Sequence, residues 1–333
     1  MNMLHDLLKK TLNIQPTDKV CILSDKYGTD IADALKSILS AGVEIEMITD
    51  DLRCYSLPDK VKDKLLSKKN NVIIICIEKE QDIWHSPERK DAKYKLHKRI
   101  TSLIAPYTTL TETNPIVDIQ LMKELGNSIY DRLKIGSNLR ILNESGTEVY
   151  AEIGKVFKED GDYSKPGTGG DFPSGEVGFS PRESSVNGKI AYDLKVQHIG
   201  FVTKGDLFVE IKNDTISDIK GDRASQFREL LLNNDIYQYV SEISFGINPC
   251  LDFCVDRDKI IEEKMAGTMH FGHGGNSAYG KRVGPHFDCV INLPTVYIDD
   301  KLFMKEGKFI SNQIPNSIRS KLSMFNLIYD GNE

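Results

Sequence analysis

The chain has 333 residues, of which 40% are hydrophobic and 28% are charged, and this is the composition of an ordinary globular protein. A single core stops growing at roughly 250–300 residues, so we expect two domains. No run approaches the ~18 uninterrupted apolar residues that cross a bilayer. The first ten residues also lack the apolar centre of a secretory signal. These features exclude a membrane protein and predict a cytoplasmic one.

Charge and cysteine content narrow the class of partner. The formal net charge is −6 and the basic residues are scattered, which is not the pattern of a nucleic-acid-binding surface. The cysteines are spread along the whole chain, and the close pair Cys250 and Cys254 has no second pair nearby to complete a zinc site. We therefore expect buried thiols, a homodimer, and a small peptide or small molecule as substrate. We expect neither nucleic acid nor membrane as a partner.

The first part of the chain alternates between strand and helix patterns. The run at 71–77 is continuously apolar, as is typical of a buried parallel strand. The other patterns, strand, helix and strand in that order, lie at 18–25, 30–42 and 43–49. This alternation predicts an N-terminal doubly wound α/β domain over residues 1–135. The turn at 27–29 lacks the glycine pattern of a dinucleotide-binding loop.

The character of the chain changes near residue 136, where Gly and Pro become denser and the strand-like runs become shorter. We predict a C-terminal mixed α/β domain over residues 136–333 that binds metal and carries catalysis. Its strand-like runs lie at 139–144, 189–196, 206–212 and 286–293, and an amphipathic helix lies at 224–234. The glycine-rich segment 163–176 is too long for a simple connector and is interpreted as a functional loop.

The segment 267–288 indicates a metal site. His286 and Asp288 form an H-x-D triplet, and a strand places two such side chains on one face. Imidazole and carboxylate are preferred ligands of Zn, Mn, Fe and Co. The glycine-rich stretch before the triplet allows His270 to return to the same site, and His273 is a second candidate. We hypothesise a metal centre that contains His270, His286 and Asp288.

Three carboxylates are further candidates, each with a structural alternative. Glu176 follows a proline and a glycine on a fixed turn, where a carboxylate is either a metal ligand or an ion-pair or cap partner. Glu242 is the only acidic residue of an apolar strand, and it needs either a metal or a salt bridge to a surface Lys or Arg. Glu263 lies in a charged run of the kind that usually forms a solvated helix face. Only its nearness to His270 makes Glu263 a candidate.

Four motifs resemble, in their order and approximate spacing, those of the thermophilic metallopeptidase family of aminopeptidases T and S. They read F-P-S-G-E-V-G-F-S-P-R-E-S-S-V-N-G-K-I-A-Y-D, S-E-I-S-F-G-I-N-P, E-E-K-M-A-G-T-M-H-F-G-H-G and H-F-D. The resemblance implies two divalent ions (Zn, Co or Mn) held by Glu176, Glu242, His270, His286 and Asp288. It also implies hydrolysis in which Glu176 or Glu242 transfers a proton. The family's tyrosine position falls on Ser277, so Tyr279 is the candidate for its role.

The same fold is similar to that of 2,5-dihydroxypyridine 5,6-dioxygenase, a non-haem iron enzyme. Its Fe(II) ligands correspond to His270, His286 and Asp288, which is the composition of a facial triad. Ligand type alone does not separate the two functions, but Glu176 and Glu242 are available for a second ion. The sequence therefore predicts a metal-dependent aminopeptidase that removes N-terminal residues from peptides. A mononuclear ring-cleaving dioxygenase and a non-catalytic relative are the alternatives.

Overall fold

The computed structural model contains two compact units. It describes residues 3–39, 44–50, 57–76, 83, 86–112, 118–251, 253–254, 256, 259–276, 282 and 284–331. The first unit comprises Met1–Ile119 and Gly161–Ser174, and the second comprises Gln120–Asp160 and Gly175–Glu333. The predicted class, an α/β unit followed by a mixed α/β unit, is confirmed. No helix in the described part of the chain has the length and apolar character that crossing a membrane requires.

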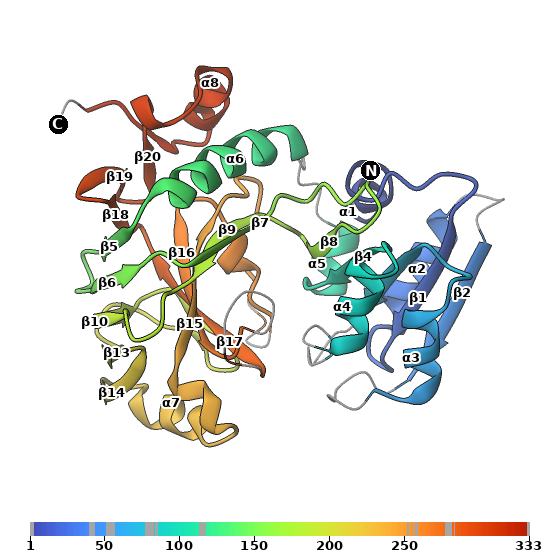
Figure 1. The fold of residues 1–333 in the computed structure, drawn as a ribbon, viewed down its shortest axis with the longest axis horizontal. Coiled ribbons are helices and arrows are strands. Elements are labelled where there is room, and N and C mark those ends of the chain that lie inside the picture. Colours follow the sequence, from blue (N-terminus) through green and yellow to red (C-terminus); the bar gives the residue numbers. More distant parts are fainter. Residues whose placement is uncertain are drawn as a thin grey trace. The chain divides into compact units, whose positions relative to one another are not determined.

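The first unit contains one parallel sheet of five strands in the order β2-β1-β3-β4-β8 (Figure 1). Because the chain moves outward from β1 in both directions, the sheet is doubly wound. The strands are β1 (Lys19–Ser24), β2 (Glu44–Thr49), β3 (Val72–Cys76), β4 (Arg99–Leu103) and β8 (Gly169–Phe172). The helices are α1 (Met3–Asp6), the π-helix η1 (Leu7–Thr11), α2 (Thr29–Ile38), α3 (Asp59–Leu66), α4 (Pro87–Tyr94) and α5 (Tyr107–Glu112). The strands and the helix predicted from the sequence before residue 77 are all present.

The glycine-rich segment 163–176, which we expected to be a loop, contains a strand. Within it β8 pairs in parallel with β4. A Cβ atom on Gly169 would lie 2.0 Å from the carbonyl oxygen of Ile100, so glycine permits this close pairing. Phe172 then fills the interior with a side chain that is 1% exposed. Because of this pairing, residues 161–174 belong to the first unit. The predicted domain ranges, 1–135 and 136–333, placed them in the second.

The second unit contains two sheets that are largely antiparallel. The seven-stranded sheet has the order β12-β11-β17-β16-β15-β9-β7, and the nine-stranded sheet has the order β14-β13-β10-β6-β5-β18-β19-β20-β21 (Figure 1). The strands of the first are β7 (Lys155–Glu159), β9 (Glu176–Ser180), β11 (Lys195–Val196), β12 (Gly200–Phe201), β15 (Val240–Gly246), β16 (Thr268–Gly274) and β17 (His286–Asn292). Those of the second are β5 (Asn138–Leu142), β6 (Glu148–Glu152), β10 (Asn187–Tyr192), β13 (Leu207–Lys212), β14 (Thr215–Lys220), β18 (Thr295–Ile298), β19 (Lys301–Lys305), β20 (Lys308–Ile310) and β21 (Ile328–Tyr329).

Helices complete the second unit. They are α6 (Ile119–Ile135), α7 (Ala224–Leu231), η3 (Asp235–Gln238), η4 (Ile261–Lys264), η5 (Ser311–Gln313) and α8 (Asn316–Met324), where η3, η4 and η5 are 3-10 helices. The predicted helix at 224–234 corresponds to α7. The run at 189–196, which we predicted as one strand, is divided between β10 and β11 in different sheets. At the division the Asp193 carboxylate accepts hydrogen bonds from the Asn292 amide at 2.8 Å and the Ser145 hydroxyl at 2.5 Å.

Aromatic packing between the two sheets determines which face of the seven-stranded sheet is apolar. Phe245 of β15 packs edge-on against Phe303 of β19, with ring centroids 5.9 Å apart. Side chains alternate along a strand, so Phe245 and Ile243 lie on the core face and Glu242 and Ser244 on the other. Glu242 and Ser244 are therefore directed away from the interface between the sheets.

We expect Phe172→Ala to destabilise the first unit by about 3–5 kcal/mol, because the substitution leaves a cavity beside the edge strand β8. This loss of stability is measured by urea unfolding that is monitored by circular dichroism. Tyr94→Ala is the matched control in the same unit, since Tyr94 is 52% exposed, and it should change the free energy of unfolding by less than about 0.5 kcal/mol. Equal effects of the two substitutions would mean that β8 does not stabilise this sheet.

Candidate metal centre

Three neighbouring strands carry candidate ligands on one face of the seven-stranded sheet. In the antiparallel register, Glu242 of β15 lies opposite Gly272 of β16, and Gly272 lies opposite Asp288 of β17. His270 and His286 are each two residues from a member of this row, so they face the same side. The register thus brings the carboxylates and imidazoles of these three strands to a single polar face.

Gly272 lies at the centre of this row and provides the space in which the side chains converge. A Cβ atom there would lie 2.9 Å from Cβ of Glu242, 3.2 Å from Oδ1 of Asp288 and 3.5 Å from Cδ2 of His286. Any larger residue would push these side chains apart. The glycine therefore leaves a cradle whose walls are ligand-type groups.

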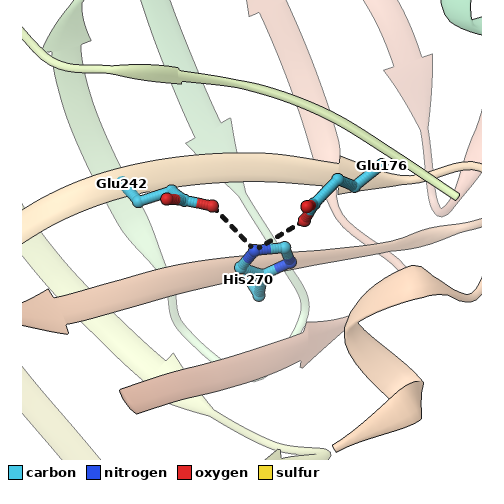
Figure 2. Close-up of side chains that lie close together, drawn as sticks. All are labelled: Glu176, Glu242 and His270. Carbon is cyan, nitrogen blue, oxygen red and sulfur yellow. Dashed lines mark hydrogen bonds and ion pairs between the residues drawn. The ribbon is translucent and has the colours of Figure 1, made fainter. Parts of the chain in front are cut away.

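His270 is the common member of two groups of ligand atoms. Its Nε2 lies 3.4 Å from Oε1 of Glu242 and 3.5 Å from Oε2 of Glu176 (Figure 2). One ligand atom from each of these three residues lies within 4.8 Å of the others, and the same holds for Glu263, His270 and Asp288. Nε2 of His286 lies 3.7 Å from Oδ2 of Asp288. The structure thus gathers the five predicted ligands and Glu263 around His270 and Asp288.

Backbone carbonyls orient both imidazole rings. Nδ1 of His286 lies 2.8 Å from the carbonyl oxygen of Gly275, and Nδ1 of His270 lies 3.3 Å from that of Glu263. A carbonyl oxygen can only accept, so Nδ1 donates in each contact and Nε2 is directed at the carboxylates. Metal-binding histidines are usually held in this way.

The hairpin between the two histidines is closed at its base by backbone pairing. Gly274 pairs with His286 in the β16–β17 register, and the Gly275 amide donates to the Pro285 carbonyl at 2.7 Å. Asn276 at the start of the connection donates from Nδ2 to Oε2 of Glu242 at 2.8 Å. Ser277 and Tyr279, which the sequence analysis considered for the peptidase tyrosine, lie outside the described residues.

Three buried carboxylate oxygens of this cluster lack a hydrogen-bond donor among the residues that the structure describes. They are Oε2 of Glu176, Oε2 of Glu263 and Oδ1 of Asp288. A buried acceptor with no donor costs free energy, so such oxygens call for a cation. Together with the two oriented imidazoles, they form a donor set that fits a divalent metal ion.

The pKa values of the cluster reflect the metal-free state. Burial raises the pKa of Glu176 to about 8. Burial alone would lower the pKa of His270, but its hydrogen bond with Glu242 and the surrounding carboxylates raise that pKa to about 10. Burial would likewise raise the pKa of Glu242, yet the hydrogen bond with His270 and nearby positive charge hold it at about 2. Without a metal, His270 is therefore a protonated imidazole beside an ionised Glu242.

Lys264 is a member of the site that the sequence analysis missed. Its Nζ lies 2.8 Å from Oε1 of Glu176 and 3.0 Å from Oε1 of Glu263. The charged run around it is of a kind that usually forms a solvated helix face, but here all four residues of η4 are buried. Burial is possible since Glu262 pairs with Lys195 at 2.9 Å, with both side chains 0% exposed. The E-E-K sequence gives the only signal, a cation beside two carboxylates.

His273, the other histidine candidate on this strand, is not part of the polar cluster. It is three residues from His270 and therefore lies on the core face, stacked on Phe287 with ring centroids 5.4 Å apart. Its Nε2 lies 2.5 Å from the Tyr192 hydroxyl, and burial lowers the pKa of His273 to about 3. His273 is thus a neutral core residue.

Comparison with known proteins finds similarity in sequence and in fold. The family model described as NicX, 2,5-dihydroxypyridine 5,6-dioxygenase, matches residues 10–311. The chain is similar to the solved structure of 2,5-dihydroxypyridine dioxygenase from Pseudomonas putida KT2440, with 20% identity, a TM-score of 0.77, and coverage of 95% of this chain and 97% of that one. It is also similar to AmpT from Thermus thermophilus, with 11% identity, a TM-score of 0.64, and coverage of 92% and 98%. No curated protein sequence matches the chain. The expected resemblance to both kinds of enzyme is confirmed at the level of the fold.

Substitutions on the two faces of the hairpin should distinguish residues that bind metal from residues that pack in the core. We expect His286→Ala and Asp288→Ala each to weaken Mn(II) binding at least about 100-fold, because each removes a ligand from a preformed site. His273→Gln, on the opposite face of the same hairpin, should retain the ion. Equilibrium dialysis with elemental analysis gives the ion content, and circular dichroism checks the fold. Full ion content in His286→Ala or Asp288→Ala would contradict the assignment.

Metal affinity should increase with pH. Because the pKa of His270 is about 10, its imidazole must lose a proton before it coordinates an ion. Between about pH 6 and pH 8 the affinity for Mn(II) should rise by up to tenfold per pH unit for each proton displaced. Calorimetry in two buffers of different ionisation enthalpy measures the protons released. A pH-independent affinity without proton release would exclude His270 as a ligand.

Proposed function

Because the chain belongs to the NicX family of 2,5-dihydroxypyridine 5,6-dioxygenases, we propose that it is a ring-cleaving dioxygenase that uses one Fe(II) ion. Its substrate would be a hydroxylated aromatic ring of the dihydroxypyridine class. The observation that carries the proposal is the extent of the family match, since residues 10–311 include all five predicted ligands and Lys264. The aminopeptidase expected from the motifs becomes the second candidate.

The ligand chemistry is consistent with this function. His270, His286 and Asp288 have the two-histidine, one-carboxylate composition of non-haem Fe(II) oxygenases, in which part of the coordination sphere stays open. Fe(II) held there supplies the one-electron chemistry that a reaction with dioxygen requires. The Gly275 carbonyl fixes the His286 ring, and the Gln197 side chain accepts the Asp288 backbone amide at 3.0 Å. These contacts would keep the ligands in place as substrate enters.

The carboxylates that a second ion would need already have partners from the chain. Oε1 of Glu242 accepts from the Ser244 hydroxyl at 3.2 Å, and Oε2 accepts from Asn276 at 2.8 Å. Oε1 of Glu176 pairs with Lys264 at 2.8 Å. These contacts favour one ion over two, and two-ion hydrolysis is correspondingly less well supported.

Glu176 is the group that we propose for proton transfer. Burial raises its pKa to about 8, and a divalent cation nearby lowers such a pKa towards neutrality. A carboxylate that titrates near neutral pH is suited to accept the proton of a substrate hydroxyl. Its Oε2, which has no hydrogen-bond donor among the described residues, is the atom that would receive it.

The assay that tests the proposal compares oxygen chemistry with hydrolysis on the same preparations. Metal-free protein is loaded separately with Fe(II), Mn(II), Co(II) and Zn(II), then supplied with 2,5-dihydroxypyridine or with an aminoacyl-p-nitroanilide panel. We expect oxygen consumption and loss of ring absorbance with Fe(II) alone, reduced at least about 100-fold in Glu176→Gln. Glu148→Gln is the control, because that carboxylate is exposed and pairs with Arg140 away from the cluster. Peptide cleavage with Mn(II), Co(II) or Zn(II), and no oxygen consumption, would support the aminopeptidase function instead of the dioxygenase function. No turnover at all would favour a non-catalytic relative.

A further inference from the structure

A buried ammonium group lies between two carboxylates of the metal cluster. Lys264 is 3% exposed, and its Nζ contacts one oxygen of Glu176 and one oxygen of Glu263, at 2.8 and 3.0 Å. The other oxygen of each carboxylate is buried and has no hydrogen-bond donor among the described residues. Two buried carboxylates that share one monovalent cation, each with an oxygen that accepts no hydrogen bond from the described residues, resemble half of a metal site.

We propose that the Lys264 ammonium takes the place of a second metal ion and thereby keeps the centre mononuclear. The inference rests on the proposed single-ion function and specifies the residue that enforces it. Its corollary is a latent divalent-cation site, with Glu176 and Glu263 as ligands, that opens when the lysine charge is removed.

The charge of the cluster supports this assignment. When Glu176, Glu242, Glu263 and Asp288 are all ionised, the four carboxylates face one ammonium. One divalent ion then brings the cluster close to neutrality, since neutral imidazoles add no charge. A second divalent ion beside Lys264 would give the cluster a net positive charge. The lysine ammonium would repel this ion at short range, because the site is poorly solvated. Without Lys264, the same second ion would restore neutrality.

Hydrogen bonds fix the main chain that carries the Lys264 ammonium. The Lys264 carbonyl accepts from the Asn248 amide at 2.8 Å, and the neighbouring Glu262 carbonyl accepts from the Thr268 hydroxyl at 3.0 Å. The Glu262 side chain is held by Lys195, which also donates to the Cys254 carbonyl at 2.6 Å. An incoming ion would therefore compete with a lysine whose main chain is fixed on both sides.

The experiment counts bound ions in wild type, Lys264→Met and Lys264→Arg. Each protein is dialysed to equilibrium against Mn(II), and its ion content is measured by elemental analysis. We expect one ion per chain in wild type and Lys264→Arg, and two in Lys264→Met, because methionine keeps the length of the side chain but not its charge. Lys98→Met is a matched control that removes a buried ammonium from the other unit, and it should leave the count at one. Adding Glu263→Gln to Lys264→Met should return the count to one.

Two ions in wild type, or one in a folded Lys264→Met, would overturn the proposal. If Lys264→Met does not fold without metal, saturating Mn(II) should restore its circular dichroism spectrum, because the second ion replaces the missing charge. If Mn(II) does not restore the spectrum, the proposal is also overturned. The outcome is independent of the activity assay, since one ion per wild-type chain without oxygen consumption would reject the dioxygenase and leave the role of Lys264 standing.

Discussion

The antiparallel register of β15, β16 and β17 is the constraint on which the candidate centre depends. It places Glu242, Gly272 and Asp288 in one row across three strands, and alternation adds His270 to the same face. A slip of one residue in β16 would exchange His270 for Phe271 and bury an imidazole in the aromatic core. The hydrophobic contacts on the other face therefore define the polar face as well, because Phe271 must remain inside.

Buried charge is the second organising feature of this unit. Glu176 and Glu263 share Lys264, and Glu262 is paired with Lys195 in a fully buried ion pair. Removing charges from water costs free energy that pairing recovers only in part, so these pairs are weak contributors to stability. Their role is better understood as positioning. The Lys195–Glu262 pair anchors η4, and η4 carries two groups of the cluster.

Local patterns predicted the residues that gather in the candidate centre better than they predicted the surroundings of that centre. The H-x-D triplet and the single acid in an apolar strand singled out His286, Asp288 and Glu242 as candidates, because alternation is a local property of a strand. Lys264 was missed because its burial depends on the ion pair between the nearby Glu262 and Lys195, which lies far away in the chain. No local pattern reveals such a pair. Alternation would also have placed His273 in the core if β16 had been predicted as a strand.

Parts of the fold were missed for a similar reason. β8 has two glycines and no apolar run, and it forms a strand only because β4 offers an edge with which it can pair. The division of 189–196 between two sheets depends on Asp193, whose hydrogen-bond partners lie about 50 and 100 residues away in the chain. By contrast, the parallel strands β1 and β3 are continuous apolar runs and were predicted within one or two residues.

The closed base of the β16–β17 hairpin has a consequence for how relatives of this chain can diverge. Since Gly274 pairs with His286 and Gly275 with Pro285, the ligands are fixed before the connection begins. Insertions or replacements beyond Asn276 can therefore accumulate without moving either histidine. Such a connection is a segment in which the sequence can change while His270 and His286 keep their positions.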